Sequence, residues 1–135
     1  MMNRYIGPRA QYLRNMSIGC NYNKGEGIRM ALDIGAAPCG DFGSYHASPM
    51  DPRSKRAGPS IYIYPYGILV NKQGRRFIDE GPGATDLTYE SVTREIFAQT
   101  RGIAWTILDA KLADIPNQSV AIRPEQPAIE ASTIA

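Results

Sequence analysis

The chain of 135 residues has few of the side chains that build metal centres or disulfide frameworks. It contains one histidine, two cysteines (Cys20 and Cys39) and no Cys-x-x-Cys spacing, so we expect no metal site. The two cysteines can in principle pair, but we interpret them as buried thiols in a reducing compartment.

Long apolar runs and dense clusters of like charge are also missing. No run approaches the roughly 20 apolar residues of a membrane span, and the first six residues lack the apolar core of a signal peptide. The 15 basic and 13 acidic residues give a net charge of +2, and the densest basic cluster is a short loop stretch of Arg53, Lys55 and Arg56. We therefore expect a cytoplasmic protein without a membrane span or a nucleic-acid partner.

The chain has no Gly-x-Gly-x-x-Gly between a strand and a helix. This absence excludes a dinucleotide-binding βαβ unit within the chain itself. The remaining composition, with 43% hydrophobic residues, is ordinary for one globular domain with its own core.

The first clear element is a helix that begins after Gly25. Ile28, Ala31, Leu32 and Gly35 recur at the spacing of one helical face, and the helix should end near Gly35. Residues 38–60 are rich in glycine and proline, which predicts a long loop with at most one short strand around residues 41–45.

The second half predicts a hairpin, a helix and a strand. Residues 68–70 form a buried strand, residues 71–74 a turn, and residues 75–78 the returning strand. Thr85 or Asp86 caps the helix. Its apolar side carries Tyr89, Val92, Ile96 and Phe97, and Glu90 pairs with Arg94 on the surface.

Residues 103–108 form a continuous apolar run that predicts a covered strand containing Trp105. With the preceding elements, this run predicts the α+β fold class: a small, mostly antiparallel sheet with two or three helices.

Three groups of residues are candidates for chemistry. Gly25-Glu26-Gly27 opens a helix and allows a ligand close to the backbone, although Glu26 also simply suits the positive end of the helix dipole. His46, in the long loop, is either a surface residue or a group that binds carboxylates. The charges Arg75, Arg76, Asp79 and Glu80 flank a strand and are interpreted as a solvated edge.

Together, the stretch GEGIRMALDIGA that starts at Gly25, the single histidine ten residues later and the stretch GILVNKQGRRFIDEG that starts at Gly67 resemble the FAD-dependent fumarate reductase and succinate dehydrogenase flavoprotein superfamily. The closest resemblance is to tricarballylate dehydrogenase-like oxidoreductases, because DEG at residues 79–81, DLTY at 86–89 and IAWTILDAK at 103–111 are similar to that branch. The resemblance covers about residues 18 to 115.

The resemblance implies a substrate-capping domain of an FAD-dependent dehydrogenase or reductase that acts on a small carboxylic acid. Residues 1–24 would be a lead-in from the FAD domain, 25–118 the capping domain and 119–135 an irregular C-terminal segment. The FAD-binding domain of the same enzyme would be the partner, and the chain alone would be inactive and would not retain FAD. Gly25, Glu26 and Gly27 would lie near the cofactor, and His46 would hold a substrate carboxylate.

The chain departs from the fumarate reductases of this superfamily in two places. Glu80 is followed by Gly-Pro-Gly-Ala-Thr-Asp without the proton-donating arginine, and the Thr-Glu pair and second arginine expected before the strand are absent. Ser60 is the nearest polar residue and the second candidate for substrate binding. The resemblance therefore favours another acid substrate or a dehydrogenation, with the catalytic proton donor unknown.

Two alternatives remain open from the residues. The chain can be a stand-alone binding or dimerisation domain that has kept the cap fold without enzyme activity, forming a homodimer through an exposed apolar face. A steroid-type substrate is the other, and it would suit four tyrosines: Tyr45, Tyr62, Tyr64 and Tyr66.

Overall fold

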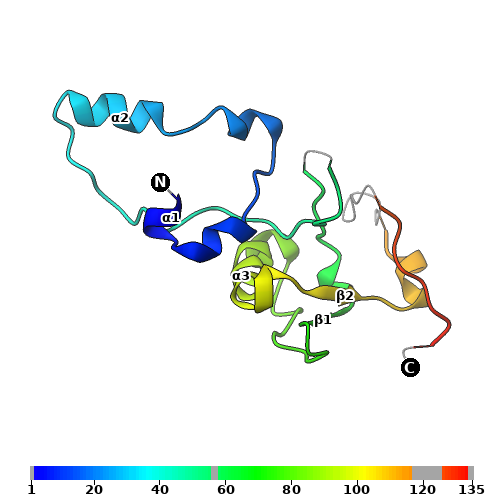
Figure 1. Cartoon of the computed structure of the whole chain (residues 1–135). Helices are drawn as coiled ribbons and strands as arrows, with labels where there is room; N and C mark the ends of the chain where they lie inside the picture. The colour runs from blue at the N-terminus through cyan, green and yellow to red at the C-terminus, as the bar shows by residue number, and fades with distance from the viewer. Residues whose placement is uncertain (1, 56–57, 117–125, 134–135) are drawn as a thin grey trace.

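The computed structural model describes residues 2–55, 58–116 and 126–133, which contain three α-helices and a small antiparallel sheet (Figure 1). The predicted α+β class is confirmed. The helices are α1 (Met2–Tyr5), α2 (Glu26–Asp33) and α3 (Thr85–Ala98), and the strands are β1 (Ile68–Val70) and β2 (Trp105–Ile107). Short 3₁₀ turns lie at Pro8–Tyr12, Ile18–Asn21, Tyr64–Tyr66, Thr100–Gly102 and Ala110–Asp114.

The sheet pairs β1 with β2, with Leu69 opposite Thr106. The predicted turn after β1 is present: the Asn71 side chain accepts hydrogen bonds from the Gln73 and Arg75 N–H groups at 3.0 and 3.1 Å. The predicted returning strand is wrong, because only one bridge, between Val70 and Arg76, follows the turn. In place of a hydrogen bond to a returning strand, the Leu69 N–H donates to the Glu80 carboxylate at 2.6 Å.

The core lies between the sheet and α3. Tyr64, Leu69 and Val92 are buried at its centre, and the Tyr64 hydroxyl lies 2.9 Å from the Thr88 hydroxyl. Partly buried side chains surround this centre: Phe77, Ile78, Tyr89, Ile96 and Ala104. Tyr89, Val92 and Ile96 of the apolar face predicted for the second helix therefore do face the core, whereas Phe97 meets the Tyr45 ring edge to face.

The predicted cap of α3 is wrong, since neither Thr85 nor Asp86 is the N-cap. Ala84 holds that position without a side-chain hydrogen bond, and the Thr88 hydroxyl donates to the Ala84 carbonyl at 3.2 Å. Asp86 lies in the first turn, where its charge favours the positive end of the helix dipole.

The helix predicted after Gly25 is confirmed as α2, and it ends at Asp33, close to Gly35 as predicted. The Gly35 N–H donates to the Leu32 carbonyl and the Ala36 N–H to the Ala31 carbonyl, both at 3.0 Å. Gly35 has a φ of 95°, and this pattern of two bonds and a left-handed glycine stops the helix. No residue of α2 is buried, and Figure 1 shows the helix held away from α3 by two long connections.

Two predictions about burial are wrong. Trp105 is 47% exposed because it lies in a two-stranded sheet that leaves its side chain in solvent. Cys20 and Cys39 are exposed free thiols rather than buried ones.

The short strand suggested for residues 41–45 is a turn, in which Asp41 accepts the Gly43 N–H at 2.7 Å. Within the described part of the chain, no helix is long and apolar enough to cross a membrane.

Segment 119–135 can be described only in part. Residues 119–125 and 134–135 lie outside the described residues, and residues 126–133 form neither helix nor strand. The segment before α2 contacts the end of α3, because the Arg9 guanidinium donates to the Phe97 and Gln99 carbonyls.

Gly67 is a position where the fold requires a glycine. A Cβ there would collide with the Ile107 carbonyl and lie 2.8 Å from a Leu108 methyl carbon. We expect Gly67→Ala to lower the free energy of unfolding by about 1–3 kcal/mol through overpacking, as measured by urea titration. Gly81→Ala is the matched control, because its Cβ would meet only an Asp79 oxygen at 3.9 Å. Equal stabilities of the two variants would contradict the close pairing of β1 and β2.

Candidate functional site

His46 lies at the junction between the long loop and α3. Its Nδ1 is 3.1 Å from Glu90 Oε2, and its Nε2 is 2.9 Å from the Tyr89 hydroxyl. The imidazole and the Tyr89 ring meet edge to face, with centroids 5.4 Å apart. The His46 side chain is 66% exposed, so a small molecule can reach it.

Arg94 fastens the loop to α3 beside His46. Its guanidinium donates to Glu90 Oε1 and to the Tyr45 carbonyl, both at 2.8 Å. The predicted pairing of Glu90 with Arg94 is thus confirmed. Hydrogen bonds from Arg94 and then from His46 lower the pKa of Glu90 below its usual value. We call these four residues, His46, Tyr89, Glu90 and Arg94, the His46 site.

The sequence pattern predicts ordinary helix roles for three of these four residues. It indicates that Tyr89 packs and that Glu90 and Arg94 form a surface pair. They lie more than 40 positions from His46 in the chain, and no local spacing in the sequence signals this contact. The resemblance identifies His46 alone.

Ser60, the other expected substrate-binding residue, is 3% exposed. It forms a bridge with Met50 inside the long loop, and its N–H donates to the Gly58 carbonyl at 2.8 Å. Among the described residues, no hydrogen bond joins Ser60 to the His46 site. A role for Ser60 in substrate binding stays a prediction.

The four tyrosines do not form one surface. Tyr64 is a core residue, 1% exposed, and burial raises the pKa of its hydroxyl. Tyr62 meets the Tyr89 ring edge to face at 5.7 Å, and its hydroxyl lies 2.9 Å from the Ser48 hydroxyl. Tyr62 therefore borders the His46 site, whereas Tyr64 is not available to a substrate.

Gly25-Glu26-Gly27 forms the exposed start of α2. Gly25 is the N-cap with a φ of 90° and no side-chain cap, so the first N–H groups of the helix have no intrahelical partner. A Cβ on Gly27 would meet nothing within 4 Å, and Glu26 accepts the Lys24 N–H at 2.9 Å. The site offers N–H donors, an exposed carboxylate and room for a ligand that carries hydroxyl groups.

The structure does not bring this helix start to the His46 site. Glu26 bonds locally, whereas His46 bonds to α3, and α2 and α3 lie in separate parts of Figure 1. In the described residues, groups of three or more His, Cys, Asp or Glu side chains that could hold a metal ion are absent.

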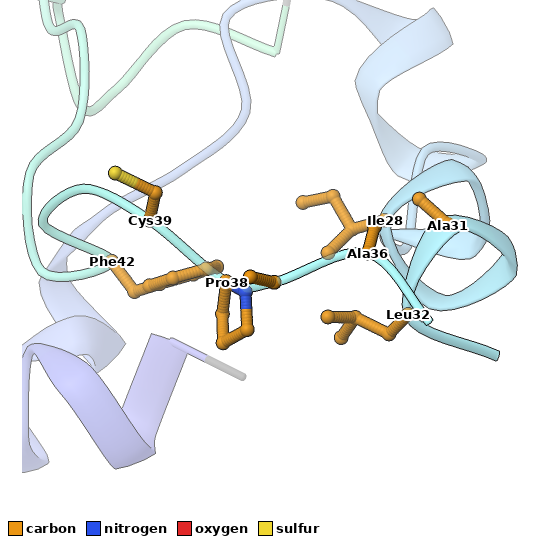
Figure 2. A pocket seen from close by; sticks show the side chains of 8 residues that line it. Ile28, Ala31, Leu32, Ala36, Pro38, Cys39 and Phe42 are labelled. Carbon is orange, nitrogen blue, oxygen red and sulfur yellow. The ribbon is translucent and has the colours of Figure 1, made fainter. Parts of the chain in front are cut away.

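An apolar hollow of about 280 Å³ lies beside α2. Side chains from α2 and from the segment after it border the hollow (Figure 2): Ile28, Ala31, Leu32, Ala36, Ala37, Pro38, Cys39 and Phe42. Ile28 and Leu32 remain 45% and 43% exposed. The described chain thus leaves an apolar face uncovered.

The charges after the turn were interpreted as a solvated edge, and for Glu80 this interpretation is wrong. Glu80 is 2% exposed, and Arg76 donates to its Oε2 from two nitrogens at 2.6 and 2.9 Å. Burial raises the pKa of Glu80, but the Arg76 and Leu69 hydrogen bonds hold the pKa below its usual value. These bonds give Glu80 a structural role.

A family model described as an FAD binding domain matches residues 4–121. The match includes α2, the His46 site, both strands and α3. Neither the curated proteins nor the solved structures gave a match to the chain.

The lowered pKa of Glu80 predicts a loss of stability in acid. Its contribution is complete above the unfolded pKa of about 4.3 and disappears as pH falls through the lower folded pKa. We expect Glu80→Gln to lower the free energy of unfolding by about 1–3 kcal/mol at pH 7, and this difference should shrink below about pH 4.

Urea unfolding at several pH values measures this difference. Asp79→Asn is the control, because Asp79 is 76% exposed and lies 3.8 Å from Arg76; it should change stability by under about 0.5 kcal/mol. A difference between wild type and Glu80→Gln that stays constant from pH 7 to acid would contradict the role of the charge.

Proposed function

The chain belongs to the FAD binding domain family, and from this membership we propose that it is the substrate-capping part of an FAD-dependent oxidoreductase that acts on a small carboxylic acid. The proposed reaction is a dehydrogenation similar to that of tricarballylate dehydrogenases. One observation carries the proposal: His46 is held by α3 at an exposed position, next to an arginine and two tyrosines.

Gly25, Glu26 and Gly27 are the residues that we propose contact FAD. Their support is the uncapped helix start, the space at Gly27 and the exposed Glu26 carboxylate, which suits hydroxyl groups better than phosphates because it repels anions. When bound, FAD supplies the acceptor for a hydride. The chain has no Gly-x-Gly-x-x-Gly for the pyrophosphate, so we propose that another FAD-binding domain of the same enzyme binds that part.

His46 is the residue that we propose binds the substrate carboxylate. The carboxylate would take the place of the Tyr89 hydroxyl at Nε2, while Glu90 keeps the other ring nitrogen and so fixes the plane of the imidazole. The guanidinium of Arg94 adds positive charge nearby. A charge-assisted hydrogen bond of this kind contributes about 1.5–3 kcal/mol.

The proposal divides the chain into a lead-in of residues 1–24, a capping domain of residues 25–118 and a C-terminal segment of residues 119–135. The core of the capping domain is the cluster around Tyr64, Leu69 and Val92. Its contacts are independent of α2, and we propose that the FAD-binding domain covers the apolar hollow beside that helix.

His46→Ala should lower kcat/KM about ten- to a hundredfold in the flavoenzyme that contains this chain, with unchanged flavin content. The imidazole binds substrate and not cofactor, so absorbance of bound flavin should match wild type. Glu26→Ala should do the reverse, weakening FAD retention first and losing activity as a result. Steady-state kinetics with flavin absorbance measures both.

His46→Gln is the matched variant, because an amide retains one N–H donor of similar reach. It should lose less than about tenfold in kcat/KM, since a neutral hydrogen bond replaces a charged one. Unchanged kinetics in His46→Ala at full flavin occupancy would refute the substrate role, and His46 would then be an ordinary loop residue.

The exposed apolar face of α2 also favours a second candidate function, a stand-alone domain that forms a homodimer. Ile28 and Leu32, which line the hollow, are 45% and 43% exposed. In this alternative a second copy of the chain, rather than an FAD-binding domain, covers Ile28 and Leu32.

Sedimentation of the purified chain, with its absorbance spectrum, separates the two candidates. The capping-domain proposal predicts a colourless chain that binds no FAD and stays monomeric at micromolar concentration. A dimer that Leu32→Glu dissociates would support the alternative, with the exposed Leu87→Glu on α3 (84% exposed) as the control. A yellow chain with about one FAD per molecule would contradict both.

A further inference from the structure

Both ring nitrogens of His46 are engaged, and their partners differ in kind. Nδ1 faces a carboxylate oxygen of Glu90 at 3.1 Å, and Nε2 faces the Tyr89 hydroxyl at 2.9 Å. An ionised carboxylate only accepts hydrogen bonds, whereas a hydroxyl donates or accepts. The proton of a neutral imidazole therefore belongs on Nδ1.

Glu90 is in a position to impose this arrangement. Its two oxygens are divided between two donors, since Oε1 accepts from Arg94 at 2.8 Å and Oε2 faces His46. Arg94 is itself anchored to the Tyr45 carbonyl at 2.8 Å. The lowered pKa of Glu90 keeps it ionised at neutral pH. The carboxylate is thus charged and fixed in orientation.

A neutral imidazole with its proton on Nδ1 has a bare Nε2. That nitrogen accepts the Tyr89 hydroxyl proton, but it cannot donate to a substrate carboxylate, and two acceptors facing each other repel. Donation from Nε2 needs a second proton on the ring.

The charged and titratable groups around His46 are Tyr89, Glu90 and Arg94 from α3, with Tyr45 and Tyr62 adjoining them from the loop and the segment before the core.

We propose that Glu90 is a positioning residue which makes substrate binding at His46 depend on a protonated imidazole. Glu90 retains the Nδ1 proton, so the substrate carboxylate binds only when Nε2 has gained a proton of its own. The substrate then binds together with one proton, and a carboxylate ligand is preferred over a neutral one. This inference rests on the proposed carboxylate-binding role of His46.

The position of the proton can be measured in this chain without substrate or flavin. His46 is the only histidine, so one set of imidazole signals appears in a long-range proton–nitrogen NMR spectrum. At alkaline pH, where imidazole is neutral, we expect the Nδ1–H tautomer in wild type. Glu90→Gln should move the proton to Nε2, because the amide N–H donates to Nδ1. Glu95→Gln, on the exposed side of the same helix, is the matched control and should leave the tautomer unchanged.

The second measurement uses the flavoenzyme that contains this chain, with tricarballylate as the probe. At alkaline pH, where a neutral imidazole predominates, we expect KM to rise about tenfold per pH unit in wild type and in Glu95→Gln. In Glu90→Gln the rise should be under about twofold per pH unit, because a neutral ring already carries a proton on Nε2. The maximal rate kcat should follow the same pH profile in wild type and Glu95→Gln.

Each outcome decides one question. An Nε2–H tautomer in the wild-type chain, or equal pH slopes of KM in wild type and Glu90→Gln, would overturn the role of Glu90 and leave the proposed function intact. If His46→Ala has wild-type kinetics, or if the flavoenzyme oxidises no carboxylic acid, the proposed function falls and this inference falls with it. The wild-type tautomer alone then still tests the geometry around Glu90.

Discussion

The fold depends on one buried carboxylate. The strand β1 pairs with a strand on only one edge. On the other edge a single bridge joins Val70 to Arg76, and the Leu69 N–H donates to Glu80 at 2.6 Å. Without this acceptor, a backbone donor would be left unsatisfied next to the core, which costs about 1–3 kcal/mol. Arg76 balances the charge from the half-exposed side. One carboxylate therefore satisfies the open edge of β1 and ties it to Arg76.

Two parts of the chain are stabilised differently: the core between β1 and α3, and the helix α2. The cluster of Tyr64, Leu69 and Val92 packs β1 against α3. The long loop is attached to α3 by Arg94, which bonds the Tyr45 carbonyl, and by Glu90, which bonds His46. The helix α2 has no buried residue and relies on its own hydrogen bonds and its glycine stop. A marginal isolated helix of this length needs tertiary contacts to be stable, and the uncovered hollow beside it is where such contacts are missing.

Periodicity predicted the elements whose apolar faces are continuous, and it did not predict the contacts between them. The faces of α2 and α3 follow from residues three and four positions apart, and the stop at Gly35 from a residue that tolerates a positive φ. The partner of β1 was assigned to the adjacent residues 75–78, because local turns favour hairpins. The actual partner is β2, 37 positions later at the Leu69–Thr106 pair, and neither this pairing nor the burial of Glu80 on the other edge of β1 has a local signature.

The contacts within the candidate site could not be predicted for the same reason, since they join residues far apart in the sequence. Resemblance identified His46 and the start of α2, but Tyr89 and Glu90 were assigned to packing and to a surface pair. Both assignments are correct as far as the helix alone is concerned: Tyr89 does pack against the core, and Glu90 does pair with Arg94. Each of these two side chains has one further polar group that the helix contacts do not use, the Tyr89 hydroxyl and Glu90 Oε2. The loop places His46 between these two groups. Because the helix fixes these two groups one residue apart on a rigid scaffold, the orientation of the imidazole is set by α3 rather than by the loop that carries it.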